Sequence, residues 1–348
     1  MKAITFQGVQ TLALQDVADP RIEAPGDVVV RVTAAGICGS DLHPYFGRET
    51  GLDPGTVMGH EFVGTVAETG SAVRTLREGD RVVAPFTTNC GECVYCTLGL
   101  TARCERGQLF GWVQEGVGLH GSQAERVRVP MADATLVRVP PGMDDAVALL
   151  AGDILSTALF GASLAGVEPG DLVVVVGCGP VGALAVRAAL ARGAREVVAV
   201  DAVPSRLALA ALFGATAVNF RTGDPAATVR ERSQGRGADC AIEAVGSPEA
   251  TRLAADLLRP GGSIAAVGVH TEPHLALSPG ERYDRNLRYA AGRCSARHYL
   301  PEALALAEGE ADLLDHLISH RLPLERGVEA SRRFADREAG WTKVVLTP

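Results

Sequence analysis

The chain has 348 residues, of which 47% are hydrophobic and 21% charged, and its formal net charge is −8. This length suits two domains better than one core, and the composition is that of a soluble globular protein. Because the balance is acidic and no basic run occurs, we expect no nucleic-acid partner, which would need a phosphate-neutralising patch.

The N-terminal residues 1–17 alternate between apolar and polar side chains, as in a strand. They lack the apolar segment of a signal peptide. Nowhere does the chain reach about 18 uninterrupted apolar residues, the length that a transmembrane helix needs. We therefore expect a cytoplasmic protein with no membrane partner.

Short β-like runs separated by turn residues dominate the first half of the chain. They cover residues 27–36, 61–70, 80–86 and 124–130. Such spacing is typical of an antiparallel or barrel-like β domain.

A second feature of this half is the string "GHEFVG", which places His60 and Glu61 between glycines. The pair is compatible with a metal ligand and its neighbour, with a general base and its partner, or with an ordinary polar turn. Spacing alone leaves these three interpretations open.

Other strings supply residues that would complete a site with His60. "GICGSDLH" carries Cys38, Ser40 and His43, and "AGDILSTALF" carries Asp153. One thiolate, one imidazole and one carboxylate, with water or a further acid in fourth place, would form an open catalytic zinc site. Taken singly, each residue also fits a plain role, such as a core histidine or a helix N-cap.

Four cysteines fall within fifteen residues, in the pattern C-x2-C-x2-C-x7-C. They are Cys90, Cys93, Cys96 and Cys104. Clustered cysteines in a cytosolic protein bind metal more often than they form disulfides, and four thiolates close a tetrahedral structural zinc site. A ferredoxin cluster is the weaker alternative, because its last gap is shorter and proline follows the final cysteine. Unrelated free thiols are the remaining alternative.

Near residue 150 the pattern changes to buried strands alternating with alanine-rich helices. This alternation predicts a parallel sheet covered on both faces, hence an α/β doubly wound domain. The alternation of strands and helices ends after about residue 292. Beyond it, residues 299–310 are expected to form a helix and residues 342–348 a closing strand.

The first predicted strand of this region runs into a G-x-G-x-x-G turn formed by Gly177, Gly179 and Gly182, with Pro180 and Val181 between the last two. A helix follows directly. This context predicts a dinucleotide site, with the pyrophosphate at the helix N-terminus. A flavodoxin-like turn without a dinucleotide is the alternative.

Asp201 ends the next predicted strand, 19 residues after the last glycine of the turn. A carboxylate at this spacing hydrogen-bonds the ribose hydroxyls of NAD and repels the 2′-phosphate of NADP. Arg206 tempers this preference, since an arginine nearby can accommodate that phosphate. We expect NAD, with NADP the less favoured cofactor.

Taken together and in order, "GICGSDLH", "GHEFVGTV", the four-cysteine lobe, "GDILSTA" and "GCGPVG" resemble the zinc-dependent medium-chain alcohol dehydrogenases. The resemblance covers essentially the whole chain. It implies a GroES-like, β-rich catalytic domain built from residues 1–153 and 292–348, with a Rossmann domain, residues 154–291, inserted between. It also implies a homodimer or homotetramer.

The resemblance further implies two zinc ions per chain. The catalytic zinc would be bound by Cys38, His60 and Asp153, with Glu61 as a fourth or exchanging ligand, and the structural zinc by the four clustered cysteines. The animal and plant enzymes have a second cysteine in place of Asp153, so this chain looks more like bacterial members.

Further roles come from the same resemblance. Ser40 would take the alcohol proton, a ribose hydroxyl would relay it and His43 would deliver it to water. Phe86 matches a substrate-pocket position. Thr157 matches a residue near the nicotinamide and Lys343 one near the pyrophosphate. For His298 and Trp112, a place in the pocket stays open.

The activity that the resemblance implies is oxidation of a primary or secondary alcohol by NAD, giving an aldehyde or ketone. A polyol or amino-alcohol dehydrogenase is the nearest alternative. An NAD-retaining formaldehyde dismutase and a non-catalytic NAD(H)-binding protein are more distant ones. A zinc-free quinone-reductase relative is disfavoured by the intact metal-type residues.

Overall fold

The computed structural model describes all residues from Met1 to Pro348 and divides the chain into two compact units. The first unit consists of residues 1–156 and 295–348, and the second of residues 157–294. The boundaries expected from the sequence, at 153 and 291, lie three residues before these limits.

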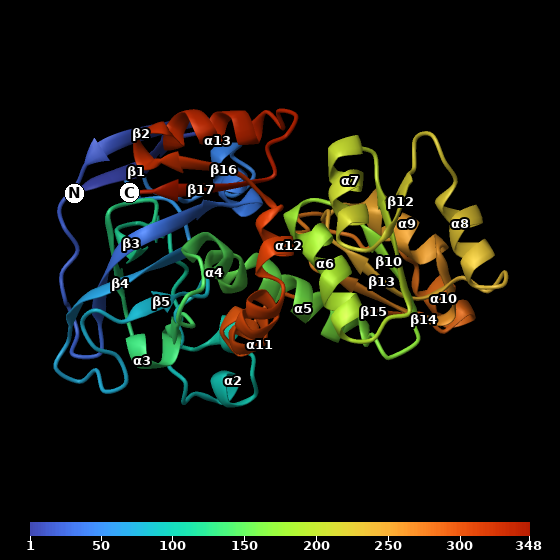
Figure 1. The fold of residues 1–348 in the computed structure, drawn as a ribbon, viewed down its shortest axis with the longest axis horizontal. Helices are drawn as coiled ribbons and strands as arrows, with labels where there is room; N and C mark the ends of the chain where they lie inside the picture. Colours follow the sequence, from blue (N-terminus) through green and yellow to red (C-terminus); the bar gives the residue numbers. More distant parts are fainter. The chain divides into compact units, whose positions relative to one another are not determined.

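The first unit is built around a seven-stranded sheet. Its strands and those of two small hairpins are β1 (Lys2–Gly8), β2 (Thr11–Asp16), β3 (Val28–Ile37), β4 (Phe62–Thr69), β5 (Arg81–Val83), β6 (Trp112–Gln114), β7 (Val117–Leu119), β8 (Arg126–Val129), β9 (Val137–Arg138), β16 (Ile318–Pro323) and β17 (Lys343–Thr347). The main sheet has the order β16-β17-β3-β4-β5-β9, and β8 also pairs with β3. β17 therefore lies beside β3, although some 300 residues separate them in the chain (Figure 1).

The helices of this unit are mostly short. They are η1 (Gly39–Asp41), α1 (Leu42–Tyr45), α2 (Val94–Thr97), η2 (Thr101–Arg103), α3 (Ala132–Thr135), α4 (Asp145–Gly152), α11 (Ala296–Gly309), α12 (Ala311–Asp315), η3 (Leu324–Arg326) and α13 (Gly327–Ala335). Valines of β3, β4, β5 and β8 pack with Phe62 and Phe110 into the core. The closing helix and strand expected from the sequence are α11 and β17.

The second unit is a six-stranded parallel sheet. Its strands are β10 (Leu172–Val176), β11 (Glu196–Asp201), β12 (Thr216–Asn219), β13 (Ala238–Glu243), β14 (Leu258–Ala266) and β15 (Arg288–Ala291). The order β12-β11-β10-β13-β14-β15 is that of a doubly wound dinucleotide-binding sheet, with the switch point between β10 and β13. The fold class expected from the sequence is confirmed.

Helices connect these parallel strands, as crossover connections require. They are α6 (Pro180–Ala191), α7 (Pro204–Leu212), α8 (Pro225–Arg232), α9 (Pro248–Asp256) and α10 (Pro279–Arg285). All five begin with proline at the first helical position, where its missing N–H costs no hydrogen bond. α6 and α7 pack against each other, and Figure 1 shows them on the same side of the sheet.

One further helix, α5 (Ile154–Ala165), contains the boundary between the units. No single helix of the chain is long and apolar enough to cross a membrane. Only α4 and α5 taken together meet that length and composition, and they are bent by 40° where they join. Nearly all of the α4 side chains are buried in the fold.

Candidate metal and nucleotide sites

The first group of candidate residues gathers at one edge of the seven-stranded sheet. β3 ends at Ile37, directly before Cys38, and β4 begins directly after Glu61. The two strands are antiparallel, with Ala35 opposite Phe62. Residues 38 and 61 are therefore held at the same edge by the register of one strand pair.

Asp153 reaches this edge from the junction of α4 and α5. It follows α4 and directly precedes α5, and its carboxylate also reaches the cluster. Its Oδ2 lies 3.5 Å from the Cys38 Sγ and 3.4 Å from the His60 Nε2.

Ligand-type atoms of Cys38, His60, Glu61 and Asp153 all lie within 4.8 Å of one another. Zinc–ligand bonds are about 2.0–2.3 Å long, so the ligands of one ion lie within about 4.6 Å. One oxygen of Glu61, Oε1, is buried without a hydrogen-bond partner. A bound cation would satisfy that oxygen, so the four residues fit a metal ion.

The orientation of His60 is set by Asp41, which is not among the predicted site residues. Asp41 Oδ1 lies 3.2 Å from the His60 Nδ1, leaving Nε2 toward the cluster. Asp41 is itself held, because its Oδ2 accepts hydrogen bonds from the Cys38 N–H and the Gln123 amide. A carboxylate behind a histidine in this way fixes the tautomer of a metal ligand.

Glu61 pairs with a residue from the C-terminal end of the chain. The Lys343 ammonium forms a buried ion pair with Glu61 Oε2 and donates a hydrogen bond to the Ile37 carbonyl oxygen, 3.3 Å away. Gly36 makes room for the carboxylate, since a Cβ at this position would lie 1.8 Å from Glu61 Oε2. The pyrophosphate contact expected for Lys343 stays a prediction; the structure gives this side chain a partner that the sequence did not indicate.

Electrostatics favours a divalent cation in this cluster. With Cys38, Glu61 and Asp153 ionised and Lys343 protonated, the formal charge is −2. Burial alone would lower the pKa of the Lys343 ammonium, but Glu61 raises it above its usual value. Burial and the nearby carboxylates raise the pKa of the Cys38 thiol, and a bound cation would oppose that shift.

Two other predicted residues lie against the cluster. Ser40 Oγ is 3.2 Å from both the Cys38 Sγ and the His60 Nε2. The Phe86 ring is buried and meets the His60 ring edge to face, with centroids 6.4 Å apart. His43, on α1, keeps a buried Nδ1 without a hydrogen-bond partner.

The four clustered cysteines form a second set of candidate ligands. Their sulfur atoms also lie within 4.8 Å of one another, and all eight cysteines of the chain are free thiols. Backbone N–H groups point at two of the sulfurs: Cys90 donates to Cys104 Sγ at 3.2 Å, and Cys93 donates to Cys90 Sγ at 3.3 Å. Four converging thiols without disulfides fit a closed zinc site.

The surroundings of the four thiols shift their pKa values in different directions. Burial alone would raise the pKa of the Cys90 thiol, but backbone N–H groups and the Arg106 side chain lower it to about 6. Burial and the neighbouring thiols instead raise the pKa of Cys96 to about 12. Burial also raises the pKa of the Cys104 thiol, so zinc binding, which needs thiolates, would displace protons from Cys96 and Cys104.

The nucleotide-type residues lie in the second unit, where fully buried β10 runs into the glycine turn. Gly177 has φ +89°, and a Cβ on Gly182 would lie 1.7 Å from the Gly177 carbonyl oxygen, so helix and turn pack without side chains. Gly179 caps α6, and no atom lies within 4 Å of where its Cβ would be. Pro180 and Val181 open α6. The turn therefore leaves open space at a helix N-terminus, where a pyrophosphate fits.

Asp201 ends β11 beside this turn. Its Oδ2 accepts a hydrogen bond of 2.7 Å from the Cys178 N–H, and its Oδ1 accepts from Ala202 and Val203. Arg206 lies 3.9 Å away. This is the position expected for a ribose-binding acid. Thr157, on α5, belongs to the same unit.

A residue pair missed by the sequence analysis lies at the carboxyl edge of the same sheet. Glu243, fully buried at the end of β13, accepts hydrogen bonds of 2.7 Å from the Val245 and Gly246 N–H groups through one oxygen. Its other oxygen lies 2.8 Å from the His270 Nε2. Because Glu243 is paired with Val176 in the sheet, His270 stands close to the switch point, where ligands of such sheets bind. The acid after a buried strand was the only sequence signal.

Comparison with known proteins identifies the family of the chain. Residues 24–141 match the family model "Alcohol dehydrogenase GroES-like domain", and residues 180–309 match "Zinc-binding dehydrogenase". The chain is 41% identical over 342 residues to zinc-type alcohol dehydrogenase B of Aspergillus flavus, covering 96% of this chain and 78% of the relative.

Solved structures give the same result. The alcohol dehydrogenase TADH from Thermus sp. ATN1 has a TM-score of 0.94 and 39% identity, covering 100% of this chain and 99% of that one. A putative zinc-binding dehydrogenase from Sinorhizobium meliloti 1021, bound to NADP, has a TM-score of 0.86 and 28% identity, covering 100% of this chain and 99% of that one.

Proposed function

Because this chain belongs to the zinc-dependent medium-chain alcohol dehydrogenase family, we propose that it transfers hydride between a primary or secondary alcohol and NAD, giving an aldehyde or ketone. The observation that carries the proposal is the convergence of Cys38, His60, Glu61 and Asp153 on one buried point. A protein that only bound NAD(H) would have no use for an open metal site of this kind, whereas in alcohol oxidation such a site can hold and activate the substrate oxygen.

The residues of the metal cluster have different roles in this proposal. Cys38, His60 and Asp153 hold the zinc, and Glu61 offers a fourth, exchangeable ligand because Lys343 competes for its carboxylate. Zinc in this position supplies Lewis-acid chemistry, which lowers the pKa of an alcohol hydroxyl.

Proton movement falls to the segment after β3. Ser40, beside two of the ligands, accepts the proton of the alcohol. His43 passes it on to water, a step that suits an imidazole because its two ring nitrogens can accept and donate a proton. Phe86 packs against the His60 ring and gives the substrate an apolar wall.

Asp201 supports NAD as the cofactor, since a buried carboxylate at this place repels a 2′-phosphate. Arg206 and the NADP bound by the Sinorhizobium relative are the reasons to test NADP beside it. The second candidate activity, oxidation of a polyol or amino alcohol, uses the same residues and differs only in the substrate pocket.

The experiment is NADH formation by zinc-replete protein over a panel of primary, secondary, polyhydroxy and amino alcohols, with NADP run in parallel. We expect turnover on simple alcohols with NAD, abolished in Cys38→Ser. A Cys240→Ser variant serves as the matched control, because that thiol is buried outside both cysteine-containing clusters and outside the glycine turn.

A flat panel in protein shown to contain zinc would refute the general alcohol dehydrogenase activity. Conversion of formaldehyde without added cofactor would then identify a dismutase that retains NAD. Failure of the protein to turn over any of these substrates while still binding NADH would identify a non-catalytic binding protein.

A further inference from the structure

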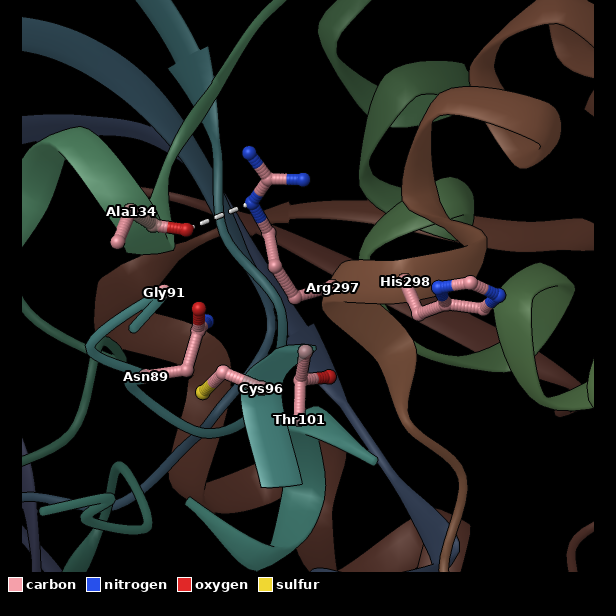
Figure 2. Close-up of a pocket in the computed structure, with 7 residues that line it drawn as sticks. All are labelled: Asn89, Gly91, Cys96, Thr101, Ala134, Arg297 and His298. Carbon is pink, nitrogen blue, oxygen red and sulfur yellow. Dashed lines mark hydrogen bonds between the residues drawn. The ribbon is translucent and has the colours of Figure 1, made fainter. Parts of the chain in front are cut away.

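A cavity of about 280 Å³ lies in the first unit, between the four-cysteine lobe and the N-terminus of α11 (Figure 2). The Arg297 guanidinium donates a hydrogen bond of 2.8 Å, from Nε to the Ala134 carbonyl oxygen. Figure 2 shows its two terminal nitrogens directed away from Asn89 and Thr101. The polar groups of this wall therefore do not converge on one ligand. At the carboxyl edge of the parallel sheet in the second unit, by contrast, several hydrogen bonds converge on one buried acid, Glu243.

Glu243 holds the two loops that follow β13 and β14. Its main-chain carbonyl oxygen accepts hydrogen bonds from the Val267 and Gly268 N–H groups, at 2.9 and 3.2 Å, directly after β14. Its carboxylate accepts two more, of 2.7 Å each, from the Val245 and Gly246 N–H groups, just after β13. One fully buried residue thus fixes the chain beyond two neighbouring strands.

His270 is the only side chain that hydrogen-bonds to this carboxylate. Its Nε2 lies 2.8 Å from Glu243 Oε2, the oxygen that the loop N–H groups do not use. An ionised carboxylate only accepts hydrogen bonds, so Nε2 is the nitrogen that carries the proton. Without the imidazole, this buried oxygen would have no partner, which is costly for a charged group. The carboxylate could then turn away from the loop N–H groups, so the imidazole fixes its orientation.

The loop that Glu243 holds lies against the glycine turn. A Cβ on Gly177 would lie 2.4 Å from the Val245 Cγ2, so the valine side chain covers the first glycine of the turn. The two loops also meet backbone to backbone, since a Cβ on Gly268 would lie 2.1 Å from the Gly246 nitrogen. Contacts this close leave no slack, so a shift of residues 245–246 would be passed on to the turn.

Apolar side chains are exposed at the same edge. Val245 and Val269, one from each loop, are 52% and 47% exposed. The edge is that of the switch point, because β13 pairs with β10, the strand that leads into the glycine turn. Ligands of doubly wound sheets bind there, and binding sites for flat rings are lined by apolar side chains. The two valines offer a dinucleotide such a lining.

We propose that His270 is a positioning residue for the dinucleotide. By donating a hydrogen bond to Glu243 it holds residues 245–246 against the glycine turn, and so sets the affinity of the turn for NADH. The imidazole acts through the acid and not by touching the cofactor. This role rests on the dinucleotide binding of the proposed function, and it does not depend on the metal cluster or on the alcohol.

The first test is amide hydrogen exchange of the full-length, zinc-replete protein without cofactor, followed by mass spectrometry. We expect the segment with residues 245–246 to exchange at least about tenfold faster in His270→Ala, because a hydrogen bond to a buried charged group is lost. His270→Gln, whose amide can replace the Nε2–H donor, should restore slow exchange. His274→Ala is the matched control, since it removes an exposed histidine of the same unit and should change nothing.

The second test is fluorescence titration of the same proteins with NADH. His270→Ala should bind NADH at least about tenfold more weakly with both zinc ions retained, and His270→Gln should bind close to the unchanged protein. Glu243→Met then separates positioning from contact. In that background His270→Ala should cost little further affinity, because the imidazole has lost the carboxylate through which it acts.

Two outcomes would overturn the role of His270 while leaving the proposed function intact, provided that the unchanged protein binds NADH. One is unaltered exchange and NADH affinity in His270→Ala. The other is an equal loss of affinity from His270→Ala with and without the Glu243 carboxylate, which would indicate direct contact with the cofactor. Failure of the unchanged protein to bind any dinucleotide would refute both the role and the proposed function.

Discussion

Ser40 is the residue whose hydroxyl the proposed proton path needs first. Its Oγ lies 3.2 Å from two members of the metal cluster, within reach of a bound alcohol. A general base at this step contributes typically about 10²–10⁴-fold. We expect Ser40→Ala to lower the rate of alcohol oxidation by that factor with both zinc ions retained, as measured by steady-state kinetics and metal analysis. Ser40→Thr, which keeps a hydroxyl, is the control; an unchanged rate in the alanine variant would refute the path.

The buried ion pair of Lys343 and Glu61 leads to a second prediction about single residues. Both are only 1% exposed, so removing one partner leaves the other charge buried and uncompensated. We expect Lys343→Met to cost about 3–5 kcal/mol of unfolding free energy, measured by urea denaturation. The double variant Glu61→Gln with Lys343→Met should recover most of that loss. An equal loss in the single and double variants would show that the pair is not coupled.

The sequence predicts which residues belong to the candidate sites better than it predicts which residues hydrogen-bond or pair with them. The resemblance to a known family implies that Cys38, His60 and Asp153 act together, although spacing alone leaves each open, and the structure brings them together. Asp41 is not among the predicted site residues, since only the folded chain places its carboxylate behind the His60 ring. The Lys343–Glu61 pair was missed for the same reason: tertiary pairing, not local sequence, creates it.

Among the elements, the glycine turn and α6 make the tightest contact. A methyl group on Gly182 would lie 1.7 Å from the Gly177 carbonyl oxygen, so the helix would have to move away from the turn. We expect Gly182→Ala to weaken NADH binding at least tenfold, measured by fluorescence titration. Both zinc ions should remain, because their ligands belong to the other unit. Unaltered NADH affinity would show that the cofactor does not use this turn.

The four-cysteine lobe is the second element with a clear test. We expect Cys96→Ser to lower the zinc content from two ions to one per chain and to reduce the melting temperature, because the lobe relies on its metal for order. The buried, lone Cys240 offers the matched control, as Cys240→Ser should keep two ions. Two ions in the Cys96 variant would mean that the lobe is not a zinc site.

Elements whose pattern is local were predictable, and those that depend on distant pairing were not. The parallel sheet follows from alternating buried strands and helices, and α11 and β17 from their own periodicity. β16 (Ile318–Pro323) was not predicted, because its polar residues give no alternation and only pairing with β17 fixes it as a strand. The cavity beside α11 has no sequence signal, since its walls come from separate segments.

For the molecule as a whole, stability should fall in acid through carboxylates such as Asp239. Burial alone would raise the pKa of Asp239, but Arg259 and the Leu172 N–H lower it below its usual value. A folded pKa that is depressed adds stability above the unfolded pKa of about 3.9, and this is lost as the pH falls through the folded value. We expect Asp239→Asn to be less stable than the unchanged protein at pH 6, with the difference shrinking below pH 4 in urea titrations. A difference independent of pH would exclude this carboxylate as a source of acid lability.

The ion pair across the sheet edge also sets an order of events during synthesis. Glu61 and Lys343 are 282 residues apart, so at roughly 5–20 residues per second the ribosome adds the lysine about 14–56 s after the acid. The whole second unit, an uninterrupted stretch of chain, is made within that interval and can fold first. Until β17 is made, Glu61 has no Lys343 to neutralise it and β3 lacks one of its neighbouring strands. The addition of β17 therefore completes both the ion pair and the sheet of the first unit.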